Sequence, residues 1–250
     1  MANFPPLKRY ILYCIDRLIE DFCLCGPFLD VGCGSADVSA HLAVKSWQGK
    51  AIDISPQVIP TAQKNLSSFP SVRLEQASLF DEEETFNTVL LLDVLEHIED
   101  DAGVLTKVYG LISEKGHLIV AVPSNPCEWR WDDEFYGHYR RYTLDQIDMR
   151  LHAAGFIPLA FWDFTYPVFW LMRRFYTAVK RAPRTMNHDK YTGTIASSCV
   201  NAWEIPLLSR LLSGDCILWQ LIYALQFHYF KDYVGNGHEM IILSRKQEHA

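Results

Sequence analysis

Residues 28–37 place a glycine-rich turn directly after a short apolar run, an arrangement that brings a backbone close to a bound ligand. Gly32 and Gly34 allow the tight turn, and the helix expected after them would point its N-terminus at the ligand. Asp53 follows Gly34 by nineteen residues, at the end of a second apolar run. A carboxylate in that place can hold the two hydroxyls of a ribose, so the spacing predicts a cofactor that contains adenosine.

The acidic residues around this turn indicate which adenosine cofactor to expect. A dinucleotide fingerprint would have its third glycine at position 37, where this chain has Asp37. Asp30 stands two residues before Gly32, and an acid beside the turn repels a pyrophosphate but attracts a cationic ligand. S-adenosylmethionine (SAM) carries a sulfonium and an ammonium group. We therefore expect SAM, and an NAD-dependent dehydrogenase ranks behind it.

Two downstream motifs indicate a family. Residues 86–98 read as a strand that runs into D-V-L-E-H-I, which contains Asp93, Glu96 and His97, and residues 137–142 read G-H-Y-R-R-Y. Together with the glycine turn, these motifs make the chain resemble the class I SAM-dependent methyltransferases. The resemblance covers roughly residues 25–165 and the last predicted strand.

This resemblance implies a set of contacts with SAM and with its product, S-adenosylhomocysteine. The implied residues are Asp30, Gly32 and Gly34 at the methionine end, Asp53 and Ile54 at the ribose, Ser78 and Leu79 at the adenine, and Asp93 at the mouth of the pocket. Many relatives carry an aspartate near position 78 that receives the adenine amino group. Ser78 is a weaker substitute, so the adenine contact departs from the family pattern.

The loop at 123–142 follows the fifth predicted strand and holds the candidate acceptor site, because ligands of open α/β sheets bind outside the carboxyl ends of the strands. His138 is the preferred general base, since imidazole takes a proton near neutral pH, and Glu134 is the second choice. A structural hydrogen bond is the alternative for His138. The candidate substrate-binding residues are Trp131, Tyr136 and Tyr139 as pocket walls, and Arg140 and Arg141 as ligands of a carboxylate or phosphate. Salt bridges to the acidic region 81–101 are the alternative for the two arginines.

Strand-like and helix-like segments alternate along most of the chain. Strands are expected at 28–31, 50–54, 72–76, 87–92, 117–122, 156–163 and 240–244, with an amphipathic helix at 7–22 ahead of them. Thr143 and Gln146 form a capping-box pattern that opens another helix. The alternation predicts an α/β fold, with a Rossmann-like, seven-stranded, mostly parallel sheet and helices on both faces.

A helical insertion is expected before the last strand. We predict a SAM-binding methyltransferase domain formed by 1–164 plus 239–250, and an insertion at 165–238. The insertion is either an extra helical layer on the sheet or a lid for a hydrophobic acceptor. In the lid hypothesis, Trp170 and Phe175 contact the acceptor while Arg173 and Arg174 face an anionic head group, so that 164–184 forms a peripheral membrane contact.

Composition narrows the class of protein. The seven cysteines are an odd number without regular spacing, which favours reduced thiols and a cytoplasmic protein, and no metal site is predicted. The net charge of the chain is −7, and residues 1–160 alone carry −10, from 13 Lys and Arg against 23 Asp and Glu. This acidic balance argues against a nucleic-acid substrate. No apolar run reaches transmembrane length, and the oligomeric state is left open.

These patterns predict a SAM-dependent methyltransferase that acts on oxygen or nitrogen of a small-molecule or lipid-like acceptor. One alternative within the same fold is methylation at carbon of an isoprenoid or polyketide. An alternative of a different class is a regulatory or partner protein that binds SAM without transferring its methyl group.

Overall fold

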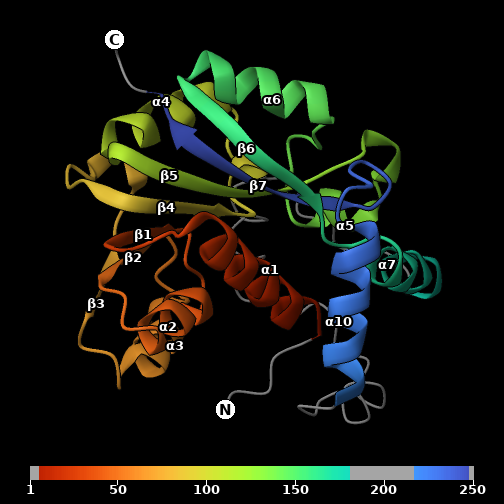
Figure 1. The fold of residues 1–250 in the computed structure, drawn as a ribbon, viewed down its shortest axis with the longest axis horizontal. Helices are drawn as coiled ribbons and strands as arrows, with labels where there is room; N and C mark the ends of the chain where they lie inside the picture. The colour runs from red at the N-terminus through yellow and green to blue at the C-terminus, as the bar shows by residue number, and fades with distance from the viewer. Residues whose placement is uncertain (1–5, 181–216, 248–250) are drawn as a thin grey trace.

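A seven-stranded sheet forms the centre of the computed structural model, which describes residues 6–180 and 217–247 (Figure 1). The strand order is β3-β2-β1-β4-β5-β7-β6, with β1 to β5 parallel and β7 antiparallel between β5 and β6. The strands are β1 Phe28–Val31, β2 Gly49–Asp53, β3 Val72–Gln76, β4 Phe86–Leu92, β5 Ile112–Pro123, β6 Phe156–Asp163 and β7 Glu239–Lys246. The sheet confirms the predicted α/β, Rossmann-like fold class.

Helices cover both faces of the sheet (Figure 1). One face carries α1 Pro6–Phe22, α2 Asp37–Val44 and α3 Ile59–Leu66, and the other carries α4 Asp101–Leu111 and α6 Leu144–Ala153. The strands feed both apolar layers because successive side chains alternate. Phe28 therefore belongs to the layer under α1, and the next residue, Leu29, to the layer under α4. The predicted capping box opens α6, where the Thr143 hydroxyl accepts from the Gln146 backbone N–H at 3.2 Å.

Three short 3-10 helices and one short α-helix lie at the carboxyl edge of the parallel strands or in its loops. They are η1 Leu79–Asp81, η2 Leu95–His97, η3 Pro126–Glu128 and α5 Trp131–Phe135. The last two belong to the loop between β5 and α6, and η2 directly follows the end of β4. Residues from separate parts of the sequence are thus collected at one edge of the sheet.

The predicted insertion contributes two described helices, α7 Val168–Val179 and α10 Ile217–Phe230. Both pack against α1. The ring of Tyr10 lies 5.5 Å from Phe169 of α7 and 5.2 Å from Tyr223 of α10, measured between centroids. Residues 181–216, which include the middle of the predicted insertion, lie outside the described residues, so the domain boundaries stay a prediction. Within 6–180 and 217–247, no helix combines the length and apolar character needed to cross a membrane.

Candidate functional site

The glycine turn after β1 has the backbone geometry that the sequence predicts. Gly32 and Gly34 adopt φ angles of 67° and 51°, in the left-handed region that favours glycine. A Cβ atom at Gly32 would lie 2.8 Å from Cγ2 of Val94, whereas a Cβ at Gly34 would meet no atom within 4 Å. The turn therefore packs tightly against the segment after β4 at Gly32 and leaves open space over Gly34, where a ligand can approach the backbone.

Asp53 joins the end of β2 to this turn. One oxygen of its buried carboxylate accepts from the backbone N–H of Gly34 at 2.9 Å, and the other accepts from the N–H of Ser55 at 2.8 Å. A carboxylate offers about four acceptor positions, so each oxygen keeps one for a further hydrogen bond. Ile54 beside it is exposed. Contact of these two residues with a ribose stays a prediction.

Asp30 and Asp37 surround the turn with negative charge. Asp30 is buried and accepts a hydrogen bond from the Ser39 hydroxyl. Burial raises the pKa of Asp30 to about 6, and the nearby charge of Asp53 adds to that rise. Asp37, at the position of the missing third glycine, pairs with Lys8 of α1 and accepts from the side chain of Asn65 at 3.0 Å. Asp37 thus fixes the turn beneath α1.

On the predicted adenine side, the Ser78 hydroxyl accepts from the backbone N–H of Phe80 at 3.2 Å and caps η1. Leu79 is buried in the apolar layer that also contains Leu29 and Ile52. Ser78 and Leu79 thus have structural tasks in η1, and their contact with an adenine stays a prediction.

Asp93 lies at the end of β4, on the same edge of the sheet as the glycine turn. Its backbone is left-handed at φ 55°, and its N–H donates to the carbonyl of Ala121 at 3.0 Å. The side chain is open to solvent, yet the surrounding protein restricts its hydration and raises its pKa to about 6, an effect that the charge of His138 partly offsets. Asp93 therefore lies near His138 of the candidate acceptor loop, residues 123–142.

His138 is held in place by Asp133 and by the segment after β4. Its Nδ1 lies 3.0 Å from a carboxylate oxygen of Asp133, and its ring lies edge-on to that of His97 with 4.8 Å between centroids. The adjacent backbone N–H of Tyr139 donates to the carbonyl of Glu96 at 2.7 Å. The acceptor loop is thus fastened directly to η2.

Asp133 is itself surrounded by buried cations. Arg141 pairs with one of its oxygens at 2.6 Å, and Arg173 of α7 pairs with the other at 2.9 Å. Burial raises the pKa of Asp133, but the hydrogen bond with His138 and the charges of both arginines outweigh this and hold the pKa well below its usual range. Asp133 is therefore a fixed anion that orients His138.

The positions of the two insertion arginines correct part of the membrane hypothesis. Arg173 is only 4% exposed and also pairs with Asp132 at 2.7 Å, so the prediction that it faces an anionic head group is wrong. Arg174 is exposed but pairs with Glu128 at 2.6 Å and lies over the ring of Trp170. Ion pairs with acidic side chains hold both arginines, although the sequence pattern suggested that they face an anionic surface.

The remaining predicted acceptor residues have internal partners. Arg140 pairs with Asp101 at 2.8 Å, in the acidic region that the alternative named. Arg141 is buried and also donates to the carbonyls of Ser124 and His238 at 2.9 and 2.8 Å. The Nε1 of Trp131 donates to the Thr177 carbonyl at 3.1 Å, so this ring packs against α7.

Tyr136 lies beside His138, with 6.3 Å between ring centroids, and Tyr139 lies under the guanidinium of Arg140. Glu134 is exposed, and its carboxylate accepts a hydrogen bond from Nε1 of Trp129 at 3.4 Å. The structure thus brings Tyr136 near the candidate base. The catalytic role of Glu134 and His138 and the substrate contacts of the loop stay predictions.

Glu96 and His97 stand in the D-V-L-E-H-I motif, and no role was predicted for either of them. Glu96 is fully buried, and neither carboxylate oxygen has a hydrogen-bond partner in the described part of the chain. Burial, together with the charge of Asp93, raises its pKa well above the usual range. Burial lowers the pKa of His97 to about 3. Glu239, at the start of β7, also has a pKa raised by burial and by Asp93.

Comparison with known proteins gives a family match. The sequence model for a methyltransferase domain matches residues 8–160. The demethylmenaquinone methyltransferase of Tropheryma whipplei (strain Twist) is 27% identical over 121 residues, which cover 48% of this chain and 50% of that protein. The ubiquinone biosynthesis O-methyltransferase of Xanthomonas euvesicatoria pv. vesicatoria is 30% identical over 98 residues, 37% of this chain and 41% of that protein. The chain spans about half the length of the curated relatives it matches.

Solved structures support the fold. The [4+2]-cyclase SpnF aligns with a TM-score of 0.59 at 17% identity, over 95% of this chain and 81% of that one. The 1,6-didemethyltoxoflavin-N1-methyltransferase of Burkholderia thailandensis, solved with 1,6-didemethyltoxoflavin and S-adenosylhomocysteine, aligns with a TM-score of 0.56 at 15% identity, over 97% and 79%. At these identities the likeness establishes a shared architecture alone.

Proposed function

Because the chain belongs to the methyltransferase family whose domain matches residues 8–160, we propose that it transfers a methyl group from SAM to a small-molecule or lipid-like acceptor. The receiving atom in this proposal is oxygen or nitrogen, and S-adenosylhomocysteine is the second product. A relative named as a ubiquinone biosynthesis O-methyltransferase supports oxygen as the receiving atom.

The observation that carries the proposal is the open glycine turn with two buried carboxylates behind it. The space above Gly34 admits a ligand, and Asp30 and Asp53 lie at the ends of β1 and β2 beneath it. Their charge suits the ammonium group of SAM and opposes a pyrophosphate. These carboxylates therefore fit SAM, and Asp93 adds a third carboxylate after the neighbouring strand β4.

The chemistry of the proposed reaction is an in-line displacement in which the sulfonium of SAM supplies the electrophilic methyl group. The protein has to orient the acceptor, remove its proton and keep water away. We assign the proton to His138, whose Nδ1 is held by Asp133, so that Nε2 is the nitrogen left to face an acceptor. The backbone link from Tyr139 to Glu96 keeps that ring at the edge of the sheet where the glycine turn lies.

A lipid-like acceptor and a peripheral membrane contact through 164–184 belong to the same proposal. Leu171, Phe175 and Val179 of α7 are 57%, 65% and 66% exposed and recur every four residues, so they form one apolar stripe. Such a stripe can lie in a membrane interface. Arg173 takes no part in that contact because it is buried.

The alternative without methyl transfer has one observation in its favour. SpnF, a cyclase by its name, shares this architecture, so the fold alone does not fix the reaction. Methyl transfer to carbon of an isoprenoid or polyketide is the alternative within the same fold.

Calorimetry and a transfer assay separate these possibilities. We expect S-adenosylhomocysteine to bind in the micromolar range, about −8 kcal/mol, and NAD not to bind. Asp53→Ala should weaken that binding by roughly 1–3 kcal/mol, the cost of an unmade hydrogen bond to a charged group. Glu20→Gln, at an exposed carboxylate of α1, is the control that should change nothing. Radiolabelled SAM and a metabolite extract would then reveal the acceptor. Binding of the cofactor without any labelled product favours the non-methylating alternative.

A further inference from the structure

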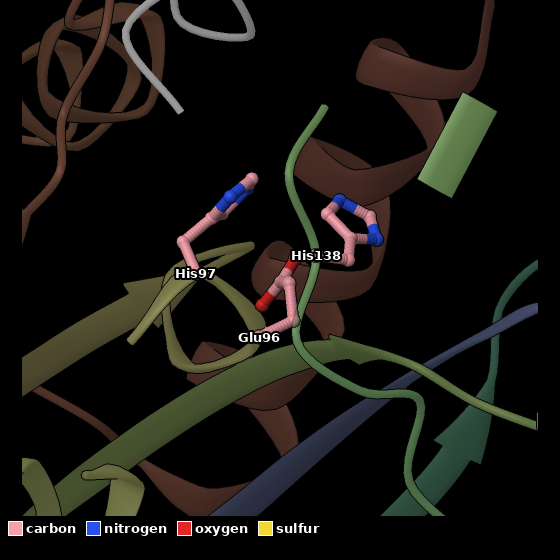
Figure 2. A group of neighbouring side chains, drawn as sticks. All are labelled: Glu96, His97 and His138. Carbon is pink, nitrogen blue, oxygen red and sulfur yellow. The ribbon is translucent and has the colours of Figure 1, made fainter. Parts of the chain in front are cut away.

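Glu96, His97 and His138 form a cluster of metal-binding side chains at the edge of the sheet (Figure 2). Glu96 and His97 come from η2 after β4, and His138 comes from the loop ahead of α6. One ligand atom from each residue lies within 4.8 Å of the others. Two ligands of a zinc ion, each about 2.1 Å from it, are at most about 4.2 Å apart. An inward movement of less than about 1 Å would therefore complete the set.

The carboxylate of Glu96 is the second, independent observation. It is 0% exposed, and neither of its oxygens has a hydrogen-bond partner among residues 6–180 and 217–247. A buried carboxylate without partners is costly, and buried charges in proteins are ordinarily paired or coordinate a metal. The structure leaves both oxygens of Glu96 available for that purpose.

From this geometry we infer that Glu96, His97 and His138 bind one divalent first-row transition-metal ion. Nitrogen ligands with a carboxylate suit manganese, iron or zinc better than magnesium, which prefers oxygen ligands alone. Three protein ligands leave coordination positions open to water or to an oxygen of the acceptor.

The surroundings of His138 match those of a metal-ligating histidine. Such histidines donate their other ring N–H to a carboxylate, which fixes the tautomer and the orientation of the ring. Here Nδ1 of His138 lies 3.0 Å from a carboxylate oxygen of Asp133, and Asp133 forms ion pairs with Arg141 at 2.6 Å and Arg173 at 2.9 Å. Nε2 of His138 is then the ligand atom.

Charge around the cluster also favours a cation. Asp93 and Glu239 lie close enough to Glu96 for like-charge repulsion, and Arg141 is the cation that opposes it. A dication at the cluster would replace this repulsion with attraction. Because Asp93 directly follows β4, Glu96 lies in η2 and Glu239 begins β7, the negative charge converges on the carboxyl edge of the sheet.

The inference rests on the proposed function and changes one part of it, since His138 would act through the ion instead of as a free base. A cation lowers the pKa of a hydroxyl that reaches it. The acceptor would then be a hydroxyl compound. Its O–H bond breaks with the proton passing to water, the oxygen bonds the methyl carbon, and the sulfur keeps the electron pair of the broken C–S bond.

Titration of the chelator-treated full chain with Mn²⁺, followed by electron paramagnetic resonance, tests the site. We expect one saturable Mn²⁺ per chain. Its affinity should fall at least about tenfold in Glu96→Gln and in His97→Ala. In Asp133→Asn it should fall about 10–100-fold, because the ring of His138 would lose the carboxylate that orients it. His152→Ala should bind as the wild type does, because His152 belongs to an exposed histidine–carboxylate pair with Asp148. Zn²⁺ competition should displace the bound Mn²⁺.

The result that overturns the inference is wild-type protein without saturable Mn²⁺ or Zn²⁺ binding, or equal affinity in Glu96→Gln and wild type. The wild-type measurement tests the metal site even if a variant fails to fold, because absence of saturable binding by the wild type is sufficient to reject it. Calorimetry with S-adenosylhomocysteine on the same samples keeps the two proposals apart. Cofactor binding without metal binding removes only the metal site, whereas metal binding without cofactor binding removes the proposed function.

Discussion

Replacing Gly34 by alanine should separate a cost in stability from a loss of cofactor affinity. Gly34 has φ 51° and open space where a Cβ would lie. A left-handed residue with a Cβ costs roughly 1–2 kcal/mol. For a chain of this size each kcal/mol lowers the melting temperature by about 2–4 °C, so a fall of about 2–8 °C is expected. Ala36 already adopts φ 58°, which indicates that this turn tolerates such a residue.

Gly235→Ala is the matched control. Gly235 also has a positive φ, 89°, and a Cβ there would meet no atom within 4 Å, but it lies in the turn before β7. Both variants should lose similar stability. Only Gly34→Ala should lose affinity for S-adenosylhomocysteine, because its methyl group would occupy the space through which the ligand reaches the backbone. We expect at least a tenfold loss, about 1.4 kcal/mol.

Gly32→Ala completes the series with a different outcome. Its Cβ would stand 2.8 Å from Cγ2 of Val94, so its melting temperature should fall further than that of Gly34→Ala. Differential scanning calorimetry and isothermal titration calorimetry measure the two effects separately. If Gly34→Ala binds S-adenosylhomocysteine as tightly as Gly235→Ala does, the open space above the turn is not the cofactor site and the reasoning fails.

Three further predictions concern the loop and the insertion. Asp133→Asn should destabilise the fold by roughly 3–5 kcal/mol, measured by urea unfolding, because Arg141 and Arg173 would stay buried without their anion. Because the pKa of Asp133 is depressed in the folded state, its contribution to the free energy of unfolding is fully present above the unfolded pKa of about 3.9 and is lost as pH falls through the folded pKa. A free energy of unfolding that does not change with pH below about 4 would contradict this. His138→Ala should lower turnover about a hundredfold with little change in cofactor affinity, and equal turnover would return His138 to a structural role. Anionic vesicles should co-sediment the chain but not Phe175→Asp, and no difference between the two would remove the membrane contact.

The fold and the cofactor turn were accessible from sequence because they depend on local patterns. Alternating apolar runs predicted the strands, and Gly32 and Gly34 predicted a tight turn after the first of them; the structure has these strands and a turn there with both glycines at positive φ. The insertion was expected to be helical, and its described segments α7 and α10 are helices. Each of these features depends on residues near one another in the chain.

The acceptor side was less accessible because its contacts join distant residues. No local sequence pattern predicts that His138 lies near Glu96. Their proximity depends on the backbone hydrogen bond from Tyr139 to Glu96 and on the path of the loop from β5 to α6. The exposed aromatic and basic pattern of α7 suggested a surface role for Arg173. The acids at 132 and 133, forty residues earlier, bury it instead.

This buried pair links the insertion to the loop of His138 through contacts that neither sequence alternative described. Arg173 projects from α7 onto Asp133, and Asp133 orients the ring of His138. The helix is therefore coupled to the candidate catalytic residue through an ion pair of 2.9 Å and a hydrogen bond of 3.0 Å. A lid that swung away with α7 would have to expose or break a buried ion pair, which is strongly unfavourable. The structure thus favours α7 as a fixed support of the acceptor loop, and any opening of the site would have to come from elements that do not carry Arg173.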